Sequence, residues 1–131
     1  MKEIIRVGKP WEQSVEFSLG VVSSGRFLYT AGITARDPEG RIVGVGDIEK
    51  QIEQCFSNLL DVLKAAKCDW GDVVKFTLYT TDMDAFVQHR PIWGSYFIDK
   101  PASTLIGVNR LIDPQMMVEI EAVVRLPDAE L

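Results

Sequence analysis

Near its C-terminus the chain alternates strictly between two kinds of side chain, over residues 116–126. The even positions are wholly apolar, whereas the odd positions include two carboxylates, Glu119 and Glu121. Because successive side chains of a strand point to opposite faces, the pattern predicts a strand with one face in a core and the other on a mixed surface. The expected core set is Met116, Val118, Ile120, Ala122 and Val124.

Five further segments have the β-branched and aromatic content of strands. They are residues 2–7, 16–22, 26–32, 72–80 and 103–108. Ser23, Ser24 and Gly25 supply turn chemistry between the second and third segments, which predicts a hairpin there. The 72–80 segment also alternates. We expect one face of Val74, Phe76 and Leu78, and another of Val73, Lys75, Thr77 and Tyr79.

Two segments carry helical periodicity. From Ile48 to Ala66, apolar residues recur at steps of three and four, which predicts one amphipathic helix of about 20 residues and about 30 Å. Asp47 is its expected N-cap. A second helix is expected after Asp82 or Asp84. Pro91 interrupts it, so a kink or two short pieces are predicted.

These elements follow one another in the order β-β-β-α-β-α-β-β. The order favours an α/β (α+β) fold: a two-layer sandwich with a mixed six-stranded sheet and both helices on one face. No shift in composition marks a linker, so residues 1–131 are expected to form one domain. The mixed face then has no cover within the chain. Its apolar content favours self-association, although antiparallel sheets often keep one face partly solvated.

Composition narrows the function classes. The chain has 131 residues with a net charge of −5 and a pI near 4.8, and it shows no basic cluster, which argues against nucleic-acid partners and anionic membranes. No apolar run reaches 18 residues, so no membrane span is expected. Two cysteines without CxxC spacing and one histidine argue against a disulfide framework and a metal site. We expect a cytoplasmic protein without a cofactor.

Glu119 and Glu121 are the sharpest candidates for chemistry. Two carboxylates on one strand face can activate water beside a substrate; alternatively, they pair with Lys75 or Arg110 on neighbouring strands. His89 is expected as a solvated helix residue without a catalytic partner.

Three other reactive or charged side chains have simpler interpretations. Arg90 is expected at the surface, although an anion ligand is the other interpretation. Cys55 falls on the helical stripe and is expected in the core. Cys68 follows the end of the helix, where an exposed thiol fits the pattern, but no neighbouring residue would activate it.

Several segments together resemble the RidA/YjgF family of reactive-intermediate deaminases, also labelled endoribonuclease L-PSP. They are PWEQSVEFS, FLYTAGITARDPEGRIVG, IEQCFSNLLDVLKAAKCDWGDVVKFTLYTTDMDAF, PASTLIGV and VEIEAVV, and they cover nearly the whole chain. The resemblance implies a homotrimer with a chorismate-mutase-like fold. It also implies hydrolysis of imines or enamines, with release of ammonia, in clefts between subunits.

The resemblance also implies roles for particular residues. Glu119 falls where the family has its water-positioning glutamate, and Gly32 where it has a backbone-contact glycine. Phe17 replaces an aromatic tyrosine that lines the cleft, and Leu105 falls on a backbone contact where many members have cysteine. Thr104 is the remaining expected substrate contact, through its hydroxyl, next to Ser103.

Ser103 is the main departure, because it occupies the place of the family arginine that pairs with the substrate carboxylate. A serine cannot make a two-pronged charged contact, and losing that contact costs about 2–4 kcal/mol. Either the substrate class has changed, or Arg36, Arg90 or Arg110 takes over.

The resemblance and this departure leave three functions open. The first is an imine or enamine deaminase of altered substrate class, and the second is a non-enzymatic trimer that binds a small metabolite. The third is RNA cleavage, which the acidic charge argues against.

Overall fold

A computed structural model describes residues 2–128. The main helices are α1 (Ile48–Ala65), α2 (Met83–Gln88) and α3 (Arg90–Trp93), with 3₁₀ turns at Pro10–Ser14, Trp70–Asp72 and Gly94–Tyr96. The strands are β1 (Lys2–Ile5), β2 (Gly20–Ser23), β3 (Phe27–Tyr29), β4 (Ile33–Thr34), β5 (Val73–Thr80), β6 (Ala102–Gly107) and β7 (Val118–Arg125).

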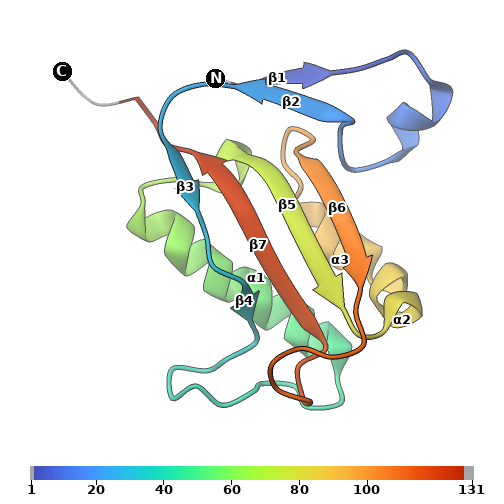
Figure 1. The fold of residues 1–131 in the computed structure, drawn as a ribbon, viewed down its shortest axis with the longest axis vertical. Coiled ribbons are helices and arrows are strands. Elements are labelled where there is room, and N and C mark those ends of the chain that lie inside the picture. Colours follow the sequence, from blue (N-terminus) through green and yellow to red (C-terminus); the bar gives the residue numbers. More distant parts are fainter. Residues whose placement is uncertain (1, 129–131) are drawn as a thin grey trace.

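The main sheet is mixed and has five strands, in the order β3-β7-β5-β6, with β4 also paired to β7. β7 is antiparallel to β3, β4 and β5. β5 and β6 run parallel, because the chain crosses over between them through α2 and α3. The helices lie on one face of this sheet and leave the other face open (Figure 1). The predicted two-layer α+β arrangement with a mixed sheet is therefore confirmed.

Strand pairing near the N-terminus differs from the prediction. β2 pairs with β1 in a separate two-stranded sheet, and β3 pairs with β7, so the hairpin across Gly25 and the six-stranded sheet were wrong. Side-chain burial explains the outcome, because Leu28 of β3 packs against the core. The turn is also fixed to β7, where Arg125 Nε donates to the Ser24 carbonyl over 2.7 Å.

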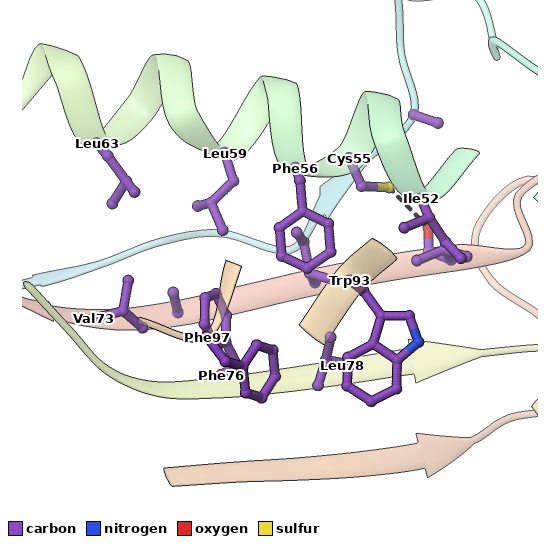
Figure 2. Close-up of a cluster of buried hydrophobic side chains, with 14 of the residues drawn as sticks. Ile52, Cys55, Phe56, Leu59, Leu63, Val73, Phe76, Leu78, Trp93 and Phe97 are labelled. Carbon is purple, nitrogen blue, oxygen red and sulfur yellow. Dashed lines mark hydrogen bonds between the residues drawn. The ribbon is translucent and has the colours of Figure 1, made fainter. Parts of the chain in front are cut away.

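Helix α1 forms as its periodicity predicts. The Asp47 carboxylate accepts a hydrogen bond from the Lys50 backbone N–H over 3.1 Å, which caps the first turn. Its apolar stripe, which includes Cys55, Phe56 and Leu59, points onto the sheet (Figure 2). Cys55 is fully buried, as expected, and its thiol contacts the Val118 carbonyl at 3.6 Å. Burial raises the pKa of this thiol.

The second helical region is broken at Pro91, as predicted. Asp82 caps α2 by accepting from the Ala85 N–H, and α3 begins one residue before the proline. His89 sits at the junction of α2 and α3. Its Nδ1 lies 2.8 Å from the Ala85 carbonyl and its Nε2 lies 3.6 Å from Glu49, a residue of α1. These contacts give the histidine a role in joining helices.

Two expectations about burial were wrong. Val73 was expected on the mixed face but is fully buried, because a bulge at the start of β5 shifts its register against β7 and turns both Val73 and Val74 inward. Cys68 is buried as well, at 7% exposure. Within residues 2–128, no helix combines the length and apolarity needed to cross a bilayer.

Candidate functional site

The two carboxylates of β7 lie on the open face of the sheet. The five expected core residues of this segment are all buried, at 3% exposure or less, whereas Glu119 and Glu121 are half-buried. The alternation of the strand is therefore confirmed residue by residue. It places the two glutamates side by side, about 7 Å apart along the strand, on the face that carries no helix.

Glu119 lies over the backbone of Gly32. A β-carbon at position 32 would occupy the same space as the Glu119 carboxylate, with its Cδ only 2.7 Å away. Only glycine leaves this space open. The structure therefore brings together two of the residues to which the family resemblance assigned a role, and it does so through packing of a carboxylate on backbone.

A bulge places Gly32 under the carboxylate. Tyr29 pairs with Val123, and Ile33 pairs with Ile120, so three residues of this edge face two residues of β7. Thr30 holds the bulge, because its N–H donates to the Ala122 carbonyl and its hydroxyl oxygen accepts from the Ala122 N–H, each over 3.0 Å. Bulges re-aim neighbouring residues, and this one sets Gly32 beside Glu119.

Glu121 has a different partner. The Tyr79 hydroxyl donates to Glu121 Oε1 over 3.1 Å. This hydrogen bond, together with burial and the charges of both glutamates, raises the pKa of the Tyr79 phenol. The alternation of its strand predicts Tyr79 on the mixed face. The sequence did not indicate the contact with Glu121, because the residue directly opposite Tyr79 in the sheet is Glu119 and the hydrogen bond runs diagonally to Glu121.

Among residues 2–128, neither glutamate takes part in an ion pair. In the part of the chain that the structure describes, the four ion pairs join Arg41 to Asp37, His89 to Glu49, Arg90 to Glu16 and Arg125 to Asp128. The alternative in which Lys75 or Arg110 neutralises the glutamates was therefore wrong. Within residues 2–128, the Glu119 carboxylate also accepts no hydrogen bond, which leaves its lone pairs for water or a ligand.

The other expected contact residues form a second group. Ser18 accompanies the start of β6, since its N–H donates to the Pro101 carbonyl over 3.1 Å and it bridges Ala102. This places the adjacent Phe17 alongside the segment that leads to Ser103. Phe17 and Leu105 both pack against the core from partly buried positions.

The two groups lie on opposite faces of the sheet. Ser103 pairs with Phe76, and Leu105 pairs with Leu78, so Ser103 and Leu105 belong to the helix-covered face of the sheet. Thr104 pairs with Thr77, which pairs with Glu121, so Thr104 belongs to the open face and is exposed. Within one chain, Glu119 therefore lies beside Gly32, and Phe17 lies beside the β6 segment. These two groups of residues do not lie together in the same chain.

Each arginine considered as a replacement at position 103 has a partner within the described chain. Arg36 Nη1 donates to the Gly40 carbonyl over 2.8 Å. Arg90 Nε lies 3.7 Å from Glu16 Oε1, and the guanidinium carbon of Arg90 lies 5.7 Å from the centre of the Trp93 ring. Arg110 donates to the carbonyl oxygens of the next two residues of its own loop.

Two hollows adjoin the Glu119 neighbourhood. One, of about 590 Å³, is lined by Gly32, Arg36 and Asn58 together with neighbouring polar residues. The other, of about 230 Å³, lies on the open face and is lined by Tyr29, Thr30, Lys75, Thr77, Glu121, Ala122 and Val123. Within residues 2–128, no cluster of histidine, cysteine or carboxylate side chains has the arrangement of a metal site.

Comparisons with known proteins identify the family of this chain. The family described as endoribonuclease L-PSP matches residues 9–126. A RutC family protein of Synechocystis is 39% identical over 109 residues, covering 81% of this chain and 83% of the relative. A mouse protein named 2-iminobutanoate/2-iminopropanoate deaminase is 33% identical over 116 residues, covering 87% of this chain and 79% of the relative.

A solved structure gives the same result for the fold. A Rid family protein of unknown function from Yersinia pestis superposes with a TM-score of 0.86 at 29% identity, covering 95% of this chain and 98% of that one. The sequence match, the relatives and the shared fold lead to one conclusion: this chain belongs to the endoribonuclease L-PSP family, the family of the Rid and RutC proteins.

Proposed function

We propose that this protein hydrolyses a reactive imine or enamine and releases ammonia, with Glu119 as the catalytic residue. The observation that carries the proposal is the Glu119 carboxylate, which is half-buried, lies against the Gly32 backbone and has no partner within residues 2–128. Relatives named 2-iminobutanoate/2-iminopropanoate deaminase support the reaction class.

The reaction needs few groups from the protein, because an imine is already reactive toward water. Water adds to the carbon of the C=N bond while the Glu119 carboxylate accepts one of its protons. That proton passes to the nitrogen and gives a carbinolamine. The hydroxyl proton then also moves to the nitrogen as the C–N bond breaks and the C=O bond forms, so that ammonia leaves and a carbonyl compound remains. General-base assistance of this kind contributes about 10²- to 10⁴-fold. An enamine enters the same path after it is protonated to the imine.

We further propose that the active unit is a homotrimer in the cytoplasm, with each site in a cleft between two copies. The separation of the two residue groups supports this, because a second copy would bring its Phe17, Ser103 and Leu105 to the Glu119 and Thr104 face of the first. Two free cysteines, Cys55 and Cys68, suit a reducing compartment.

The second candidate function is a non-enzymatic trimer that binds a small metabolite in the same cleft. Ser103 favours it, since the expected carboxylate-binding arginine is absent. One experiment separates the two functions: imines generated by amine and amino-acid oxidases are mixed with the protein, and carbonyl release is followed above the spontaneous rate.

The deaminase predicts an accelerated release that Glu119→Ala abolishes and that Glu39→Ala, in an exposed turn, leaves unchanged. If no imine or enamine is hydrolysed faster than in buffer, the deaminase proposal is wrong. The binder would then be supported by saturable binding of an imine analogue without turnover.

A further inference from the structure

A hollow of about 390 Å³ lies beside the N-terminal loop, and three cations line it. Arg6 and Lys9 come from the segment between β1 and the 3₁₀ turn at Pro10–Ser14, and Lys100 comes from the segment that leads into β6. Lys100 lies 88 positions after Glu12 in the chain, so the local charge pattern gave no sign of this cluster. The fold therefore gathers positive charge in one hollow of a protein whose net charge is −5.

Glu12 supplies the carboxylate found among the described residues that line this hollow, and the loop uses it for its own structure. Its carboxylate accepts a hydrogen bond from the Lys9 backbone N–H over 2.6 Å, and the Val7 N–H lies 3.2 Å and 3.3 Å from its two oxygens. These contacts hold the carboxylate against the backbone at the start of the turn. Three cations against one carboxylate leave the hollow with an excess of two positive charges.

Two features hold Lys100 at the hollow. Its Nζ donates to the Glu12 carbonyl over 3.1 Å, and the lysine is partly buried. Its backbone φ is +49° and that of Asp99 before it is +58°, so two consecutive residues other than glycine adopt the left-handed conformation. Such a conformation costs free energy and persists where the surrounding structure fixes it. An ammonium group has three N–H donors, so one carbonyl occupies only part of its capacity and does not neutralise its charge.

From this arrangement we infer that the hollow between the N-terminal loop and Lys100 binds a small phosphate monoester. At neutral pH a phosphate monoester carries close to two negative charges and has three strong acceptor oxygens. These properties match the excess of two positive charges and the three separate cations. Arg6 offers a planar fork that can bind two phosphate oxygens, whereas Lys9 and Lys100 act as point charges. A monocarboxylate has half the charge and one acceptor oxygen fewer, so it is the poorer match.

The size of the hollow favours a small ester over a nucleic-acid strand. Ligand pockets in proteins typically measure about 300–1,000 Å³, so 390 Å³ holds a phosphate together with a short organic group. Pro10 and Gln13 also line the hollow and offer an apolar surface and an amide to that group. A nucleic-acid strand needs a basic stripe that continues along the surface, which an acidic protein with a single basic hollow does not match.

A ligand in this hollow joins two segments that meet at the start of β6. Ser18 already links them, because its hydroxyl donates to the Lys100 carbonyl over 2.6 Å and it bridges Ala102 (Figure 1). A phosphate bound by Arg6 and Lys9 on one segment and by Lys100 on the other adds a second link. The inference does not rest on the proposed function, since none of these residues is assigned to the imine chemistry.

Titration of glycerol 3-phosphate into ¹⁵N-labelled protein at constant ionic strength tests the site. We expect saturable binding with a dissociation constant below about 1 mM, together with shifts of the Gly8, Lys9 and Lys100 amide signals. Acetate should bind at least tenfold more weakly, and glycerol should produce no saturable shifts. Absence of saturable binding by glycerol 3-phosphate overturns the inference, and so does an equal affinity for acetate.

Charge-removing variants locate the bound phosphate. Arg6→Gln and Lys9→Gln should each weaken binding of glycerol 3-phosphate by at least about threefold, whereas Lys64→Gln, at an exposed position of α1, should not. Arg6 and Lys9 are exposed, so their variants should keep the fold and the wild-type thermal midpoint without ligand. Unchanged affinity in both variants overturns the inference. A single-stranded oligonucleotide that binds more tightly than glycerol 3-phosphate overturns the assignment to a small ester.

Discussion

The contact between Gly32 and Glu119 shows how one missing side chain shapes the site. The carboxylate occupies the space that any other residue at position 32 would fill. Gly32 is not among the glycines with positive φ, so its backbone conformation is one that alanine also adopts. The glycine is therefore needed for room beside the carboxylate, and its conformational freedom is not used.

Gly32→Ala should reduce imine hydrolysis at least tenfold, because the new methyl group displaces the Glu119 carboxylate. The fold should survive, since the backbone tolerates alanine. Gly20→Ala is the matched control, because a β-carbon there meets Ile5 at an ordinary contact distance of 3.6 Å. Rates and thermal midpoints of both variants check this. Full activity in Gly32→Ala would contradict the proposed position of Glu119.

How far the sequence predicts the structure is clearest at the level of elements. The period of α1, its cap at Asp47 and the alternation of β7 are local signals, and all three were predicted correctly. The pairing of β3 with β7 joins residues almost 100 positions apart. The bulge at the start of β5 depends on another long-range register, that of β5 against β7. Local turn residues such as Gly25 therefore favoured the wrong hairpin.

Helix α1 also contributes a pH dependence to stability. Burial raises the pKa of the Cys55 thiol above its ordinary value of 9.0, so the native state holds this proton more tightly than the unfolded chain does. The contribution is complete below that value and is lost as the pH rises above it. The free energy of unfolding should therefore fall between pH 8 and pH 10.5.

Urea unfolding of wild type and Cys55→Ala across this range measures the effect. Cys55→Ala should be less stable at pH 8, because it leaves a small cavity, but its stability should fall less steeply toward alkaline pH. Both proteins keep Cys68, whose thiol pKa is also raised by burial. Both therefore keep the loss of stability at alkaline pH that comes from this second thiol. Parallel slopes for the two proteins would show that Cys55 does not carry the dependence.

At the scale of the whole molecule, the residues expected in one site are divided between two faces of the sheet. The sequence identified Glu119, Gly32 and Ser103 through the family resemblance, but no local pattern showed that Ser103 and Glu119 would follow opposite faces. Tyr79 went unrecognised for a related reason, since its contact with Glu121 is diagonal across two strands. This separation is the reason for proposing that the site is shared between copies of the chain.

Sedimentation equilibrium should give a mass of three chains of 14.7 kDa each. The specific activity should fall on dilution into the range where the trimer dissociates, because the two groups then separate. A monomer that keeps full activity per chain would contradict the shared site. An open face with exposed Tyr29 is the surface that such an assembly would cover.

The most direct test of the central claim is the rate of ammonia release by Glu119→Gln, measured with the imine that wild type hydrolyses fastest. Glutamine keeps the shape of the side chain over Gly32 but cannot accept the proton from water. The deaminase account predicts a loss of at least 100-fold, with an unchanged thermal midpoint and full activity in Glu39→Gln. A Glu119→Gln rate equal to that of wild type would contradict it.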